Sequence, residues 1–146
     1  MNLFGMLELS GSALGAERQR AEVVASNMAN AQTTRTPAGG PYRRQMVVFQ
    51  AQRVPRFALS FALAGAQREN SSAVRVAAVV SDQRPPAMRF EPGHPDANAQ
   101  GYVAYPQVDP IEEMTDLLGA VRAYELNASA VQATKNMIAQ SLDLLR

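Results

Sequence analysis

Residues 110–146 read PIEEMTDLLGAVRAYELNASAVQATKNMIAQSLDLLR, and this stretch is the most informative part of the chain. Pro110 is suited to the start of a helix, and the acidic residues Glu112, Glu113 and Asp116 suit the positive end of the helix dipole. Apolar residues then recur at alternating steps of four and three, which predicts one long helix over residues 111–146 with a coiled-coil seam. The seam positions are Leu117, Val121, Tyr124, Ala128, Val131, Lys135, Ile138, Leu142 and Leu145.

A weaker stripe of the same kind runs through residues 1–36, where Gly5, Gly11 and Gly15 each cost a helix about 1 kcal/mol relative to alanine. This helix is expected to end near residues 30–34, before a turn rich in proline and glycine. Neither stripe can bury itself alone, and heptads do not show which chain holds the partner. The stripe consists of Leu3, Met6, Leu7, Leu14, Ala21, Val24 and Met28.

All nine prolines lie between Pro37 and Pro110, so two helix-permissive ends flank a turn-rich middle. The predicted fold class is α+β: a helix in residues 1–36, a small β-rich unit in residues 37–110, and a helix in residues 111–146 that packs on the first as a coiled-coil-like layer. The second candidate strand below could equally be a helical turn or a loop. Candidate strands are Tyr42–Gln50, Arg56–Leu63, Ala73–Val80, Ala87–Phe90 and Tyr102–Tyr105.

Composition excludes several classes of function. Fourteen basic residues face 13 acidic ones, a balance that argues against nucleic acid as a partner. The chain has no cysteine and only one histidine, His94 in a Pro-Gly-His-Pro turn, and no catalytic constellation is recognisable. We therefore expect no enzyme activity, no cofactor and no metal site.

The sequence predicts no membrane insertion, because no run of 18 apolar residues occurs. The apolar start lacks a positively charged first region, and Glu8 interrupts it after seven residues. We therefore expect that no leader peptide is cleaved from this end.

The charged residues near the helix start, in the first strand and in the two stripes are expected to be solvated or to contact a neighbouring subunit. Glu112 and Glu113 are expected to form a solvated first helical turn, and Arg43-Arg44 a solvated strand edge. Glu17 and Lys135 interrupt the two stripes. In a level antiparallel hairpin these two charges lie about 16 Å apart, so each is expected to face water or a neighbouring subunit.

Three asparagines lie at or beside the stripes. Asn30 is expected to cap the end of the first helix, because asparagine tolerates left-handed backbone geometry. The alternative for Asn27 and Asn30 is amide hydrogen bonding across a helix contact, which would fix the register of that contact. Asn127 is placed beside the second seam.

Several motifs resemble those of bacterial flagellar rod and hook proteins. The clearest are ASNMANA at residues 25–31, followed by Thr33-Thr34, and RAYELN at residues 122–127. The resemblance covers residues 1–50 and about 73–146, whereas residues 51–72 look longer than the family usually has between these blocks. Motifs similar to the proximal rod proteins of the C type in particular are GSAL at 11–14, YRRQMVVFQ at 42–50, FEPGHP at 90–95 and GYV at 101–103.

This resemblance implies a structural subunit of the flagellar rod in the periplasm, which transmits torque from rotor to hook. It implies export by the flagellar type III apparatus and, as partners, other rod proteins and further copies of the chain. The rival interpretation is a soluble cytoplasmic coiled-coil adaptor that binds one partner protein. The candidate subunit-contact residues are Leu7, Leu14, Val24, Asn27, Met28, Asn30, Leu117, Val121, Tyr124, Asn127, Ala128, Val131, Ile138, Leu142 and Leu145.

Overall fold

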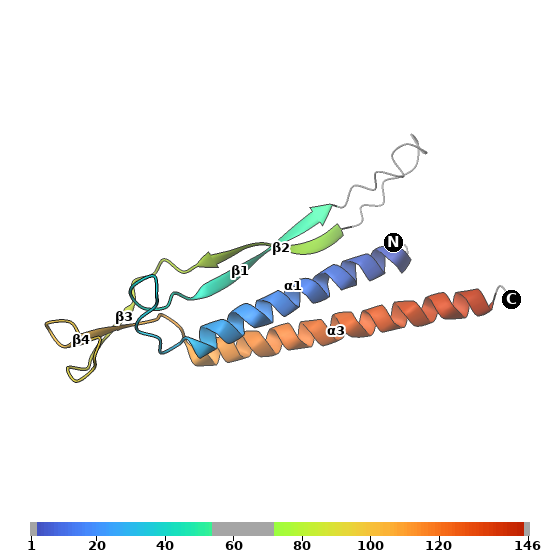
Figure 1. The fold of residues 1–146 in the computed structure, drawn as a ribbon. Helices are drawn as coiled ribbons and strands as arrows, with labels where there is room; N and C mark the ends of the chain where they lie inside the picture. Colours follow the sequence, from blue (N-terminus) through green and yellow to red (C-terminus); the bar gives the residue numbers. More distant parts are fainter. Residues whose placement is uncertain (1–2, 54–71, 145–146) are drawn as a thin grey trace.

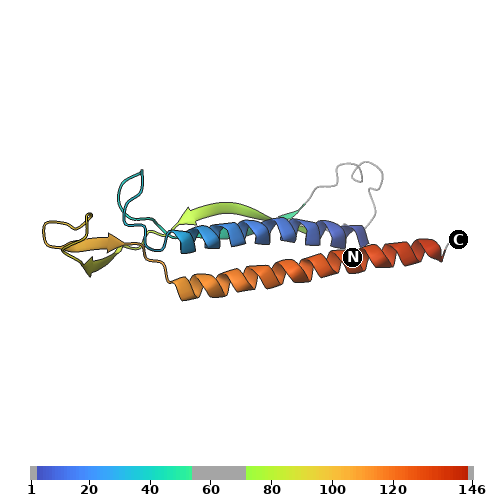
Figure 2. The same cartoon turned by 60° about the horizontal axis from the view of Figure 1, so that its bottom comes forward.

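Two long helices, α1 (Leu3–Ala29) and α3 (Pro110–Asp143), lie side by side and run antiparallel (Figure 1). The computed structural model describes residues 3–53 and 72–144. Both predicted helices are therefore confirmed within these ranges. Figure 2 shows that α3 extends past the first turn of α1, so its last turns have no helix beside them.

Local sequence signals fix the helix ends. At the start of α3, the Asp109 side chain accepts a hydrogen bond from the Ile111 amide at 2.9 Å, and Pro110 occupies the first turn. At the end of α1, the Asn30 amide donates to the Ser26 carbonyl at 2.9 Å. This cap works through the side chain and not through left-handed backbone, because every positive φ among the described residues belongs to glycine.

The middle of the chain forms two separate antiparallel ribbons. Strand β1 (Gln45–Arg53) pairs with β2 (Ser72–Ser81), with a bulge between Val48 and Phe49. Strand β3 (Ala87–Phe90) pairs with β4 (Tyr102–Tyr105), as predicted. The first strand begins at Gln45, three residues later than expected, and the predicted strand Arg56–Leu63 lies outside the described residues.

The elements are stacked in layers, which confirms the predicted α+β class. The β1–β2 ribbon lies along α1, and α3 lies along another side of α1 (Figure 1). The β3–β4 ribbon extends beyond the end of the two helices where α3 begins. Among the described residues the buried apolar core consists of only four side chains: Ala16, Val24, Val103 and Ala120.

The most deeply buried side chains of α3 are small or polar. On α3 the fully buried residues are Glu113, Ala120 and Thr134, and the half-buried Asn127 continues the same seven-residue spacing. Within the chain the buried line thus precedes, by one residue, the line through Val121, Ala128 and Lys135 that the apolar pattern favoured. Small side chains allow two helices to approach closely, so the bulkier neighbours are left outside the contact.

Gly101 is required by the tip of the β3–β4 ribbon. Its φ is +80°, and an added Cβ would lie 2.9 Å from the Phe90 ring, which itself stacks edge-on against Tyr102 with ring centroids 5.3 Å apart. We expect Gly101→Ala to destabilise this ribbon by about 1–3 kcal/mol, measured as faster amide exchange at Tyr102. Gly39→Ala is the matched control, because Gly39 has a φ of +87° but open space around it. An equal effect of both substitutions would contradict the steric argument.

Candidate functional site

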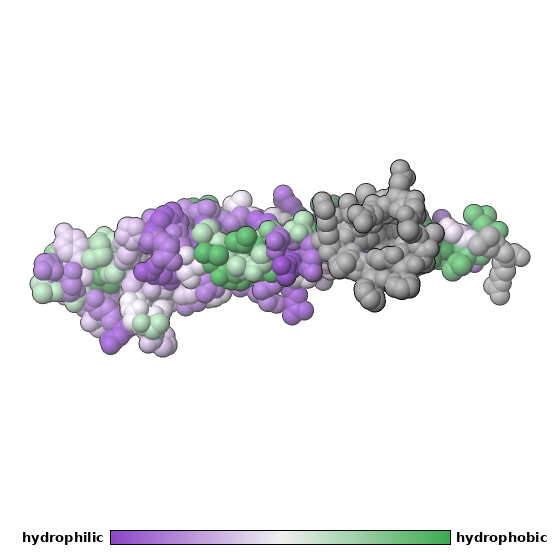
Figure 3. All heavy atoms as spheres, turned by 90° about the horizontal axis from the view of Figure 1, so that it is seen from above, coloured by the Kyte–Doolittle hydropathy of each residue, from purple (hydrophilic) through white to green (hydrophobic). Residues whose placement is uncertain are grey.

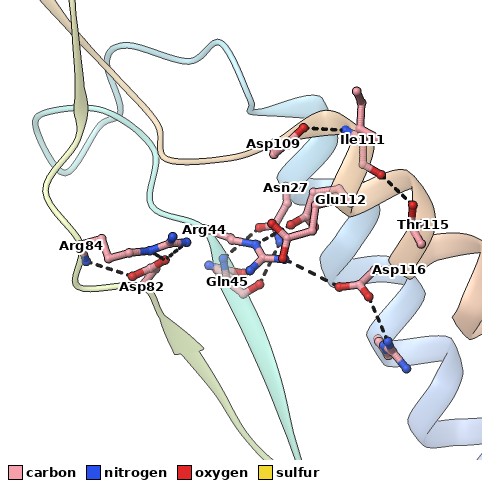
Figure 4. A network of polar contacts seen from close by, with 12 residues as sticks. Asn27, Arg44, Gln45, Asp82, Arg84, Asp109, Ile111, Glu112, Thr115 and Asp116 are labelled. Atoms are coloured by element: carbon pink, nitrogen blue, oxygen red, sulfur yellow. Dashed lines mark hydrogen bonds and ion pairs between the residues drawn. The ribbon is translucent and has the colours of Figure 1, made fainter.

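Asn27 anchors the first residue of β1 to the helices. Its side chain is 1% exposed and makes four hydrogen bonds. The amide donates to the Gln45 carbonyl at 2.8 Å and to Glu113 at 2.9 Å. Its side-chain oxygen accepts from the backbone N–H of Gln45 at 2.9 Å and from the Tyr42 hydroxyl at 3.0 Å. Both donors and both lone pairs are therefore used, and α1, α3 and β1 meet at this side chain (Figure 4).

Glu113 and Arg44 form a buried ion pair beside Asn27. Glu113 is fully buried, and its second oxygen accepts from Arg44 Nε at 2.5 Å. Arg44 Nη2 also lies 3.4 Å from Glu112 and 3.7 Å from Asp116. Burial disfavours the charge on Arg44, but Glu113, helped by the other two carboxylates, outweighs it, so the pKa of the guanidinium is raised above its usual value.

The polar cluster extends along the helix contact towards Glu17. Arg20 on α1 donates to Asp116 at 3.3 Å and lies 3.7 Å from Glu17. Glu17 Oε2 is buried without a hydrogen-bond partner, and Lys135 is exposed on α3. Glu17 thus pairs with Arg20. It does not pair with Lys135, in agreement with the distance expected for a level hairpin. The Glu17 side chain does not face open water, however, since only 17% of it is exposed.

Two expectations about charged residues were wrong. The first turn of α3 is solvated at Glu112 but not at Glu113, and Arg44 is not on a solvated strand edge. Arg43 does lie exposed, where it donates to Gln83 at 3.0 Å. The sequence signal for the burial of Glu113 was its position, because Glu113 stands seven residues before Ala120, on the line that α1 covers. A search for apolar residues does not detect this signal.

Besides Phe4 on α1, large apolar side chains remain exposed on three surfaces of the described molecule. One follows the flank of α3 turned away from α1, and one is the ribbon tip with Met88, Phe90 and Tyr102. The third is the outward face of the β1–β2 ribbon, where Met46 is paired with Val80 and Val48 with Ala78; hydrophobic residues gather on this ribbon in Figure 3. Contiguous exposed apolar surface of this kind marks sites of protein association.

The candidate contact residues divide into two groups. Val24 and Asn27 are buried within the chain, and Leu7, Leu14, Met28, Asn30, Leu117, Asn127, Val131 and Ile138 are partly covered. Val121, Tyr124, Ala128 and Leu142 are exposed, and Leu145 lies outside the described residues. The exposed group is therefore not covered by α1 within the described part of the chain.

The described part of the chain contains no candidate metal-binding group and no candidate membrane-spanning helix. Within residues 3–53 and 72–144, no three histidine or carboxylate side chains gather closely enough to hold a metal ion. Over the same residues, neither helix combines the length and apolar character that crossing a membrane requires. The distinctive features are the buried polar cluster and the exposed apolar surfaces.

Comparison with known proteins identifies the family. Residues 7–35 match the family described as flagella basal body rod protein, and residues 99–144 match the C-terminal family of flagellar basal body rod FlgEFG proteins. Flagellar basal-body rod proteins FlgC of Borreliella burgdorferi, Yersinia enterocolitica and Bacillus subtilis are each 38% identical to the chain. These alignments span 99–100% of the chain and 98–99% of each relative. The chain therefore belongs to the FlgC family of flagellar basal-body rod proteins.

Proposed function

We propose that the chain is a structural subunit of the flagellar basal-body rod, assembled through its two terminal helices. The observation that carries this proposal is that a chain of the FlgC family has an antiparallel helix pair whose apolar flank is exposed along α3. A shaft that transmits torque has to resist shear between subunits. Many small contacts along helices packed side by side add up to that resistance, and no catalytic group is needed.

The partners we propose are further copies of the chain and other rod proteins, within a rod that crosses the periplasm. Export by the flagellar type III apparatus, without a cleaved leader, belongs to the same proposal. A buried core of four small and medium side chains among the described residues suits a chain that folds after export, because little apolar area is buried before assembly.

Fractionation tests this function directly. Full-length tagged chain expressed in its own flagellated bacterium should copurify with basal bodies after the membrane is dissolved. A chain that stays in the cytosol in complex with one partner would instead support the coiled-coil adaptor and overturn the rod assignment.

A substitution on the exposed flank of α3 should separate folding from assembly. Leu118 is 53% exposed, so Leu118→Asp should change the free energy of unfolding of the isolated chain by less than about 0.5 kcal/mol. In basal bodies the same variant should be strongly depleted, because a carboxylate would be buried in the subunit contact. Thr115→Asp, on another exposed side of α3, is the control and should be incorporated normally. Equal recovery of both variants would contradict this role of the flank.

A further inference from the structure

Each helix carries an exposed line of residues at alternating steps of four and three, in addition to the buried contact between the helices. All positions on both lines are exposed. This spacing matches that of a coiled-coil seam, and neither line is covered within the described part of the chain. The outer line of α1 is Phe4, Glu8, Gly11, Gly15, Arg18, Glu22, Ala25 and Ala29, and the outer line of α3 is Met114, Leu118, Val121, Glu125, Ala128, Gln132, Lys135 and Ala139.

We propose that the outer line of α3 in one copy packs antiparallel on the outer line of α1 in the next copy. This inference rests on the proposed rod function and specifies the subunit contact. Aligned antiparallel, the two lines match position by position from Phe4 opposite Ala139 to Ala29 opposite Met114, because the order of four- and three-residue steps is the same in both.

Charge complementarity fixes both the occupant and the register. Glu8 and Arg18 are ten residues apart on α1, and Glu125 and Lys135 are ten residues apart on α3. In the alignment Glu8 faces Lys135, and Arg18 faces Glu125. Within the described chain neither Glu8 nor Lys135 has an ion-pair partner, and Arg18 pairs only with Glu22, at 2.9 Å. Opposite charges on facing seam positions select both partner and orientation.

Side-chain sizes agree with the same register. On α3 the large side chains Met114 and Leu118 face Ala29 and Ala25 on α1. At the other end the large residue is on α1, where Phe4, 69% exposed, faces Ala139. In the middle Gly15 faces Ala128, which permits close approach of the two backbones. At both ends of the contact, large residues thus meet alanines.

The contact joins two different surfaces and therefore repeats without closing on itself as a dimer. Within one chain Asn27 contacts Glu113, whereas the outer lines place Ala29 opposite Met114. The second register is displaced by about three residues, which corresponds to a rise of roughly 4.5 Å along the helix axis from copy to copy. A lateral contact with an axial rise generates a helical arrangement of subunits.

Disulfide cross-linking tests the contact, since the chain has no cysteine of its own. Two singly substituted chains, Ala25→Cys and Leu118→Cys, are expressed together, and basal bodies are isolated and oxidised. We expect a covalent dimer that contains one chain of each kind. The matched control pairs Ala25→Cys with Gln132→Cys, which lies on the same outer line about 21 Å further along and should not cross-link.

Each outcome decides the proposal. Cross-linking of Leu118→Cys with itself would mean a two-fold contact between α3 helices and would overturn it. Recovery of the chain in basal bodies with linkage only to a different rod protein, or with no linkage, would also overturn it while leaving the rod function intact. Absence of the chain from basal bodies would overturn the rod function and this contact with it.

Charge reversal gives an independent test of the register. Glu8→Lys and Lys135→Glu each place like charges opposite one another between copies, so each should lower incorporation into basal bodies several-fold. The double variant Glu8→Lys/Lys135→Glu restores the opposition of charges and should restore incorporation. Normal incorporation of either single variant, or a double variant no better than the singles, would contradict the proposed register.

Discussion

Replacing Glu113 by alanine should lower the free energy of unfolding by about 3 kcal/mol, because it removes the closest carboxylate partner of a nearly buried Arg44 and leaves only the longer contacts with Glu112 and Asp116. The Arg44 side chain is only 11% exposed, and its shortest ion pair is the one with Glu113. The substitution also removes one of the four hydrogen bonds of Asn27. Urea or thermal unfolding of the isolated chain, followed by far-UV circular dichroism, measures the loss.

Glu112→Ala is the matched control, since Glu112 stands one residue earlier and also contacts Arg44, at 3.4 Å. Its side chain is 60% exposed, so the loss should stay below about 1 kcal/mol. The double variant Glu113→Leu/Arg44→Met removes both charges and should recover much of the stability lost in Glu113→Ala. Similar losses for Glu112→Ala and Glu113→Ala would show that the cluster is not a buried ion pair.

The sequence predicted those elements whose signals are local. Spacing, capping residues and turn residues predict the two helices and the strands Ala87–Phe90 and Tyr102–Tyr105. The late start of β1 was not predictable in this way, because Gln45 begins the strand through its two hydrogen bonds with Asn27, 18 residues earlier in the chain. A contact of this kind is set by tertiary structure.

The line of α3 that is buried within the chain lies one residue before part of the predicted seam, whose role in subunit contacts stays a prediction. The apolar pattern selects Val121 and Ala128, whereas α1 covers Ala120 and Asn127. The reason is physical: hydrophobicity reports where a side chain avoids water, but a single subunit of an assembly buries only part of its apolar surface. Glu113 was therefore assigned to solvent, and the predicted seam includes residues that stay exposed in the isolated chain, such as Val121 and Ala128.

Replacing Gly15 by leucine should stabilise the isolated chain and prevent its assembly. Gly15 lies in the interior of α1 with open space around the position of an added Cβ. Relative to glycine, leucine favours the helix by about 0.5–1 kcal/mol, so thermal unfolding of the isolated variant should shift to higher temperature. Within the rod, a leucine facing Ala128 of the next copy should hold the two helices apart, and the variant should be missing from basal bodies.

Gln19→Leu separates this effect from that of an added apolar group. Gln19 is exposed on α1 but stands off the outer line, so a leucine there should leave incorporation unchanged. A variant that is merely destabilised loses both stability and incorporation into basal bodies. Gly15→Leu is instead expected to be more stable than the unmodified chain and to lose incorporation. A glycine in a helix costs stability in every isolated subunit, and among the described residues no neighbour requires it at position 15. Normal incorporation of Gly15→Leu would mean that the subunit contact does not require a glycine at position 15. It would also mean that α1 faces something other than α3 of the next copy.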